Sequence, residues 1–166
     1  MSAEHDLDLL LVNPGGRGRI YQNLGQELAA KEPPIWAGLL ATHARRRGRS
    51  VAILDSNALD LDPAATAAQV AALRPRLTVV TVYGHNPNAS TFAMPGATDI
   101  CDAIAEHAPE RPVLLLGGHV AALPERTLRE ERVPFVCGGE GPVTIDELLD
   151  ALAAGGGQTE LAKVRG

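Results

Sequence analysis

The feature that most constrains the fold is the alternation of five short apolar runs with segments of helical periodicity. The runs, which we interpret as strands, occupy residues 8–12, 51–54, 77–82, 112–116 and 133–137. Helical segments begin near residues 33, 63, 97, 124 and 142. Because each strand is followed by a helix, the order predicts an α/β fold: a doubly wound, five-stranded parallel sheet with helices on both faces. The expected strand order is the common one, 2-1-3-4-5.

The two longest connections in this scheme follow the first and third strands, over residues 13–33 and 83–95. In the order 2-1-3-4-5 these two strands are neighbours, and the switch point of the sheet lies between them. Ligands of open parallel sheets bind beyond the carboxyl ends of the strands at this point. We therefore expect the two loops to lie side by side and to line a ligand site.

Local signals predict helix ends and packing faces. Asp62 followed by Pro63 indicates an N-cap and a first-turn proline. Thr144 and Glu147 have the spacing of a capping box, although Pro142 indicates an earlier helix start. The first helix is predicted to bury an apolar face made of Ile35, Trp36, Leu39, Leu40 and Ala44. The last helix is predicted to bury Ile145, Leu148, Leu149 and Leu152.

Composition excludes several classes of protein. The formal net charge of −5 is spread along the chain, whereas nucleic-acid binding needs a clustered basic face. The two cysteines, Cys101 and Cys137, lie too far apart for a zinc or iron–sulfur motif, and we expect buried, reduced thiols. No apolar run approaches the roughly 20 residues of a membrane span, and no signal peptide is recognisable. We expect a cytoplasmic protein without a membrane span.

Familiar phosphate-binding and catalytic motifs are missing. The chain has no Walker loop, no complete G-x-G-x-x-G fingerprint and no G-x-S-x-G nucleophile elbow. Instead, glycine pairs follow two strands that the predicted order makes adjacent, at Gly117–Gly118 and at Gly138–Gly139. Glycine lets a backbone approach a bulky ligand closely, but each pair alone also fits a tight turn. Two pairs at the same edge as two long loops favour a ligand.

Residues 9–152 resemble the cobalamin-binding domain found at the N-terminus of cobalamin-dependent radical S-adenosylmethionine enzymes. The resemblance rests on five stretches in order: Leu11-Val-Asn-Pro14, Pro34-Ile-Trp-Ala-Gly-Leu-Leu-Ala41, Asp55, Gly117-Gly-His-Val120, and Val136-Cys-Gly-Gly-Glu-Gly-Pro-Val-Thr144 with Glu147-Leu-Leu149. It implies a flavodoxin-like fold and a bound cobalamin (B12), whose nucleotide tail enters the sheet edge while the corrin ring rests on the loops.

The resemblance also implies how cobalt is held. Other cobalamin domains carry D-x-H-x-x-G after the first strand, and the histidine of that motif ligates cobalt. Here Asn13 stands for the aspartate, Gly15 stands for the histidine and Gly18 keeps the last glycine. We therefore expect no protein ligand to the metal, with His85 in the third loop the one weak candidate. A surface histidine is the simpler interpretation of His85.

The predicted cofactor-binding residues follow from these stretches, and no catalytic residue is predicted. The set consists of Asn13, Pro14, Gly15, Gly16, Thr81, Tyr83, His85, Ser90, Thr91, Gly117, Gly118, His119, Gly138, Gly139, Glu140 and Gly141. Alternatives stay open for several of them. Ser90 and Thr91 either donate to the tail or cap a helix, Glu140 either faces the tail or caps, and Tyr83 either packs on the corrin or belongs to the core.

The sequence lacks the C-x-x-x-C-x-x-C motif that binds the cluster of a radical enzyme. We therefore expect residues 1–154 to form a cobalamin-binding module that is not catalytic alone, and residues 155–166 to be a linker or tail. The partner would be a radical S-adenosylmethionine domain, in cis or in trans, that holds the 4Fe–4S cluster and S-adenosylmethionine for methyl transfer. The alternative is a flavodoxin-like domain that binds flavin or a nucleotide.

Overall fold

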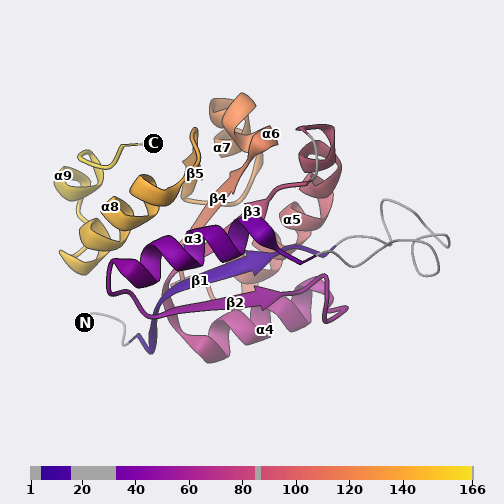
Figure 1. The fold of residues 1–166 in the computed structure, drawn as a ribbon, viewed down its shortest axis with the longest axis horizontal. Coiled ribbons are helices and arrows are strands. Elements are labelled where there is room, and N and C mark those ends of the chain that lie inside the picture. The colour runs from indigo at the N-terminus through magenta and orange to yellow at the C-terminus, as the bar shows by residue number, and fades with distance from the viewer. Residues whose placement is uncertain (1–4, 16–32, 85–86, 166) are drawn as a thin grey trace, which may run out of the picture.

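The computed structural model describes residues 5–15, 33–84 and 87–165, and it contains a five-stranded parallel sheet (Figure 1). The strands are β1 (Leu7–Asn13), β2 (Val51–Asp55), β3 (Pro75–Val82), β4 (Val113–Gly117) and β5 (Phe135–Cys137). They lie in the order β2-β1-β3-β4-β5, with every neighbouring pair parallel. The predicted fold class and strand order are therefore confirmed.

Helices cover both faces of the sheet (Figure 1). They are α3 (Ile35–Arg46), α4 (Pro63–Leu73), α5 (Pro87–His107), α6 (Gly118–Ala122), α7 (Pro124–Glu130), α8 (Pro142–Ala153) and α9 (Gln158–Leu161). Alternate residues of β1 point to opposite faces, as the period of a strand requires. Leu10 and Val12 pack with residues of α4 and α5, whereas Leu9 and Leu11 pack with residues of α3 and α8.

The predicted N-cap of α4 is confirmed. The Asp62 carboxylate accepts a hydrogen bond from the backbone N–H of Ala65 at 2.7 Å, and Pro63 occupies the first helical position. Asp62 thus pairs with one of the free N–H groups at the start of the helix, and Pro63 has no N–H that would need a partner.

The predicted loop over residues 83–95 is wrong, because α5 already begins at Pro87 and contains Pro95. Proline normally breaks a helix, yet Pro95 is exposed while its neighbours Met94 and Ala97 are buried in the core beneath α5. Tertiary packing on this face outweighs the local cost of the proline. The expected pair of long loops at the switch point is therefore not formed. The loop expected after the first strand stays a prediction, because residues 16–32 lie outside the described residues.

The apolar face predicted for α3 is only partly correct. Leu40 and Ala44 are buried, but Ile35, Trp36 and Leu39 are 65%, 43% and 58% exposed. The helix instead buries two small residues, Ala37 and Ala41, against the sheet. Small side chains let the helix axis approach the strands closely, which turns the larger residues of the first turns outward.

The helix start that Pro142 indicates is confirmed, since α8 begins at Pro142, whereas the capping-box spacing of Thr144 and Glu147 does not form a cap. The N-cap of this helix is Gly141, at φ +94°, and no side chain caps it. Thr144 and Glu147 bind Arg165 instead. The core stripe of α8 is confirmed, with Ile145, Leu148 and Leu149 buried and Leu152 packed against the same cluster. The short helix α6, which directly follows β4, was not predicted from the sequence.

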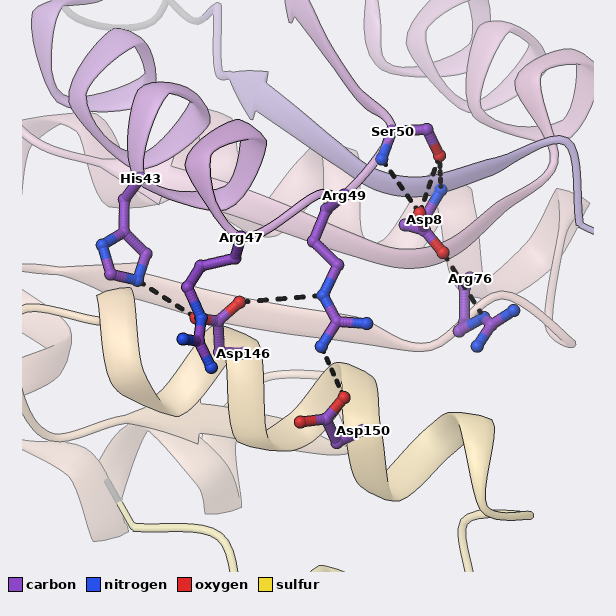
Figure 2. Close-up of polar contacts among 8 residues, drawn as sticks. All are labelled: Asp8, His43, Arg47, Arg49, Ser50, Arg76, Asp146 and Asp150. Carbon is purple, nitrogen blue, oxygen red and sulfur yellow. Dashed lines mark hydrogen bonds and ion pairs between the residues drawn. The ribbon is translucent and has the colours of Figure 1, made fainter.

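A polar cluster joins α3 to α8 (Figure 2). The carboxylate of Asp146, on α8, is 10% exposed and lies 3.1 Å from both His43 Nε2 and Arg47 Nε. Arg49 Nε approaches the other oxygen at 3.8 Å, and the Arg49 guanidinium also pairs with Asp150. The Asp146 carboxylate thus links the last turn of α3 to the first half of α8. Its three basic neighbours provide the hydrogen bonds and opposite charges that a buried carboxylate needs.

The same figure shows a second group at the start of the strands. The Asp8 carboxylate accepts from the backbone N–H and the hydroxyl of Ser50, at 2.9 and 2.8 Å, and Arg76 Nε lies 4.0 Å away (Figure 2). Burial raises the pKa of Asp8, but the two hydrogen bonds from Ser50 and the nearby arginines outweigh it and lower the pKa overall. These contacts fix the amino end of β1, at the edge opposite the candidate site.

Among the helices that the structure describes, none combines the length and the apolar character needed to cross a bilayer.

Candidate functional site

The carboxyl edge of the sheet gathers most of the residues predicted from the sequence. Asn13 ends β1, Thr81 and Val82 end β3, and Gly117 ends β4. The register places these ends next to one another, with Val82 opposite Gly117 and Leu116 opposite Cys137. Residues 138–141 follow directly after β5. The predicted stretches therefore meet at one edge, around the switch point between β1 and β3.

A hydrogen-bond network joins α5 to α6 at this edge. The hydroxyl of Ser90, which is buried, donates to the carbonyl of Val82 and accepts from the backbone N–H of His119 at 2.9 Å. Thr91 Oγ1 lies 3.1 Å from His119 Nδ1, with the direction of donation set by the imidazole tautomer. Ser90 lies inside α5, so it does not cap that helix. The network holds His119 and Thr91 at the surface beside the end of β3.

The two glycines after β4 have different roles. A Cβ atom on Gly117 would lie 2.0 Å from the carbonyl oxygen of Val82, so close packing of β4 on β3 requires glycine there. A Cβ atom on Gly118 would make only ordinary contact with the Ser90 side chain, at 3.5 Å. Gly118 is exposed, and within the described residues no other side chain lies within 4 Å of that position. The edge is therefore open at Gly118, which fits the close approach of a large cofactor.

An aromatic pair lies at the end of β3. The rings of Tyr83 and Trp36 stack, with centroids 4.6 Å apart and an interplanar angle of 19°. Burial raises the pKa of the Tyr83 phenol, and Cys137 and Glu140 raise it further. Tyr83 was predicted as a site residue but Trp36 was not, because the sequence analysis placed Trp36 in the helix core. An exposed tryptophan so close to the carboxyl edge provides a flat apolar surface.

The end of β1 is anchored through side chains. Asn13 Nδ2 donates to Asp55 Oδ1 at 2.9 Å, and the same oxygen accepts from the backbone N–H of Ala58 at 3.0 Å. The carboxylate of Asp55 thus fixes the amide of Asn13 and the turn after β2. Pro14 and Gly15 follow and are partly exposed. Gly16 and His85 lie outside the described residues, so their predicted roles stay predictions.

Thr81 holds the switch point together. Its side chain is buried, and its hydroxyl donates to the carbonyl of Val12 at 3.0 Å. The hydroxyl proton is therefore engaged between β3 and β1. Thr81 shapes the floor of the edge, and its donor is already satisfied within the sheet.

The turn over residues 138–141 forms the other side of the edge. Gly138, Gly139 and Glu140 are exposed, and apart from its chain neighbours no described residue lies within 4 Å of a Cβ placed on Gly139. Gly141 has φ +94°, and a Cβ there would lie 2.8 Å from Leu116 Cδ2. The left-handed backbone favours glycine at position 141, and a side chain there would also displace the end of Leu116.

The described side chains at this edge offer hydrogen-bonding, aromatic and glycine surfaces. Within residues 5–15, 33–84 and 87–165, no three histidine, cysteine, aspartate or glutamate side chains are grouped to hold a metal ion. The described members of the predicted set lie at or next to this edge, and their contact with a cofactor stays a prediction.

Comparisons with known proteins agree with this geometry. A family model described as the B12 binding domain matches residues 22–149. An uncharacterized methyltransferase of Pyrococcus horikoshii is 32% identical over 151 residues, which cover 90% of this chain and 30% of that protein. The chain thus spans less than a third of the length of this curated relative.

Two solved structures are similar in fold. Both are of the radical S-adenosylmethionine methyltransferase TsrM from Kitasatospora setae. One, with cobalamin and a 4Fe–4S cluster bound, superposes at a TM-score of 0.72 with 20% identity, over 98% of this chain and 28% of that one. The other, with tryptophan substrate and a S-adenosylmethionine analogue bound, superposes at a TM-score of 0.65 with 21% identity, over 89% and 26%.

Proposed function

The chain belongs to the family of B12-binding domains, and on that premise we propose that it is the cobalamin-binding module of a radical S-adenosylmethionine methyltransferase. Cobalamin, the cofactor expected from the sequence, is the ligand for which the family is named. The observation that carries the proposal is the family match over residues 22–149, on a sheet whose carboxyl edge is open and rich in glycine.

The methyltransferase part of the proposal draws on the relatives. The Pyrococcus horikoshii protein is described as a methyltransferase, and TsrM is a radical S-adenosylmethionine methyltransferase. The module would present methylcobalamin to a separate radical domain, in cis or in trans. That domain would hold the 4Fe–4S cluster and S-adenosylmethionine, and this chain would not be catalytic alone.

We assign the following residues to cofactor binding: Asn13, Pro14, Gly15, Gly16, Tyr83, His85, Ser90, Thr91, Gly118, His119, Gly138, Gly139 and Glu140. Thr81, Gly117 and Gly141, which were also predicted, would shape the edge beneath the cofactor. Bound cobalamin would supply a cobalt-borne methyl group, and the protein would supply its position and surroundings. Exposed Gly118 leaves room for the nucleotide tail beside Ser90. Thr91 and His119 offer polar atoms to the amides of the cofactor, and Tyr83 offers its ring to the corrin.

A direct test compares cofactors on one preparation. The chain is mixed with hydroxocobalamin or with flavin mononucleotide and desalted, and the absorption spectrum of the protein fraction is recorded. We expect stoichiometric retention of hydroxocobalamin and loss of the flavin. Retention of the flavin alone would support the flavodoxin-like alternative and overturn the assignment.

We propose a cytoplasmic location. Cys101 and Cys137 are free and buried, as expected for a compartment in which thiols stay reduced. Burial raises the pKa of the Cys101 thiol far above its ordinary value, which makes it inert at neutral pH. Mass spectrometry after alkylation of the folded and the unfolded protein would test whether the thiols are protected. We expect both thiols to be modified only on unfolding.

A further inference from the structure

The chain reverses direction after α8 and returns along it. Gly155 and Gly156 have φ values of +106° and +65°, and their backbone N–H groups donate to the carbonyls of Leu152 and Ala151 at 3.2 and 2.9 Å. This is a Schellman turn, which ends the helix and satisfies its last carbonyls. The residues that follow, 157–165, include α9 and are called the strap below. Figure 1 shows α9 beside α8.

The strap is packed on the domain. Leu161 and Val164 are partly buried and lie against the apolar cluster that α3 and α8 form with the sheet. The strap is therefore held against the domain by apolar contacts at two positions. That residues 155–166 form a linker or tail stays a prediction.

The end of the strap is held by a clasp of three residues. Glu147 Oε2 accepts from the backbone N–H of Arg165 at 2.8 Å, and Glu147 Oε1 accepts from Arg165 Nε at 2.8 Å and from Nη2. Thr144 Oγ1 donates to the carbonyl of Arg165 at 2.7 Å. The N–H, the carbonyl and the guanidinium of one residue are thus all bound by the first turns of α8. The strap therefore ends near the amino end of α8, at the carboxyl edge of the sheet.

The clasp shares an atom with the edge of the candidate site. Thr144 Oγ1, which binds the strap, also lies 3.6 Å from Cys137 Sγ, the thiol being the donor. Cys137 ends β5 and Thr144 lies in the first turn of α8, so the pair joins the two ends of the exposed turn over residues 138–141. Thr144 thus contacts both the strand end that precedes this turn and the residue that ends the strap.

We propose that strap closure and cobalamin binding are coupled through the turn over residues 138–141, so that each favours the other. The inference rests on the proposed function, because it takes this turn as part of the cofactor site. A ligand that orders the turn fixes Thr144 in the position that binds Arg165 and thus favours the closed strap. By linkage, the closed strap raises the affinity for the ligand by the same factor.

The experiment uses the 166-residue chain and hydroxocobalamin as the probe. Hydrogen exchange of peptides from residues 157–165 is measured with and without hydroxocobalamin, and the dissociation constant is measured by absorbance titration. The test variant is Glu147→Ala, which removes three hydrogen bonds of the clasp while keeping a good helix former. The matched control is Glu160→Ala, which removes the exposed pair with Lys163 in the same strap.

Coupling predicts three results. Hydroxocobalamin slows hydrogen exchange of the strap in the wild-type chain. Glu147→Ala weakens binding of hydroxocobalamin by at least about fivefold, the low end of typical coupling between sites. Glu160→Ala changes neither the binding nor its effect on exchange. If hydroxocobalamin binds the wild type and Glu147→Ala equally and leaves strap exchange unchanged, the coupling is wrong while the proposed function stands. If the wild-type chain does not bind hydroxocobalamin, both the coupling and the proposed function are wrong.

Discussion

Gly118 is the residue whose substitution tests the cofactor site most sharply. Among the described side chains, its Cβ position meets only Ser90, at 3.5 Å, so Gly118→Val is expected to fold. The added methyl groups would extend into the open edge and occupy space assigned to the nucleotide tail. We expect the affinity for hydroxocobalamin to fall at least about tenfold, a loss of about 1.4 kcal/mol. Absorbance titration and thermal unfolding on one sample measure both quantities.

The control for this change is Gly38→Val. Gly38 lies in α3, and beyond the adjoining helix backbone no described residue lies within 4 Å of a Cβ placed there. This variant bears the same added side chain and should bind hydroxocobalamin as the wild type does. Unchanged affinity in a folded Gly118→Val protein would remove the tail from this edge.

Gly117 is expected to behave differently from its neighbour. A Cβ there would lie 2.0 Å from the Val82 carbonyl oxygen, a backbone atom that cannot move aside cheaply. We expect Gly117→Ala to lower the free energy of unfolding by about 1–3 kcal/mol, the usual cost of overpacking. Urea denaturation followed by circular dichroism measures it. Wild-type stability would mean that β3 and β4 separate easily at this end.

Sequence reasoning located these glycines but could not separate their roles. The pair Gly117–Gly118 fits both a tight turn and a ligand, and only the distance to Val82 assigns the first glycine to packing. Trp36 was missed for a related reason. Its spacing suggested the buried face of a helix, whereas Ala37 and Ala41 occupy that face. Alanine-rich helices give weak periodicity, so their orientation depends on the shape of the sheet beneath.

At the scale of elements, the contact between α3 and α8 depends on Asp146. Its carboxylate is nearly buried among His43, Arg47 and Arg49 (Figure 2). Asp146→Asn removes the charge and replaces one of the two acceptor oxygens by an amide NH2, which faces basic groups. We expect the free energy of unfolding to fall by about 1.5–3 kcal/mol, the usual worth of a charged hydrogen bond. Chemical denaturation provides the value.

Asp150→Asn is the matched control for this prediction. Asp150 lies one turn further along α8, is 65% exposed and pairs with Arg49 alone. Exposed ion pairs contribute about 0–1 kcal/mol, so this variant should be close to the wild type in stability. Equal losses for the two variants would show that burial of Asp146 adds nothing.

The clasp of the strap should depend on pH through Glu147. Hydrogen bonds from the Arg165 guanidinium and backbone N–H lower the pKa of the Glu147 carboxyl below its ordinary value of 4.5. A lowered folded-state pKa gives a contribution that is present above the ordinary value and is lost as the pH falls through the folded value. We therefore expect the clasp to be closed at neutral pH and to open only below pH 4.5.

The Arg165 amide resonance reports this opening, because its N–H donates to Glu147. Its chemical shift, followed by NMR from pH 7 downward, should titrate with a midpoint below 4.5, and Glu147→Ala should abolish the titration. A midpoint at or above 4.5 would contradict the closed clasp.

Element prediction failed where local and tertiary signals conflict. Pro95 favoured a loop, but burial of Met94 and Ala97 keeps that part of the chain in α5. Thr144 and Glu147 have the spacing of a capping box, yet a segment 18 residues further along the chain binds Glu147 instead. Such long-range partners leave no local trace in a sequence.

For the whole molecule, the alternation of strands and helices was enough to predict the sheet order. Right-handed crossovers and the burial of both sheet faces leave few other arrangements. The place of the site followed, because the switch point of such a sheet lies between β1 and β3. The individual contacts did not follow, since they depend on side-chain directions such as that of Ser90, which points to Val82 and not into solvent.

We expect the carboxyl edge of the sheet to bind cobalamin with its nucleotide tail extended and without a histidine on cobalt. This expectation is motivated by Gly15, which stands where related domains carry the histidine, and by the open edge at Gly118. The most direct measurement is the electron paramagnetic resonance spectrum of cob(II)alamin mixed with the chain. We predict that the protein-bound cofactor loses the nitrogen superhyperfine splitting, which in the free cofactor comes from the nitrogen of its own tail. Splitting that persists in the protein-bound fraction would contradict it, whether the nitrogen comes from the tail or from His85.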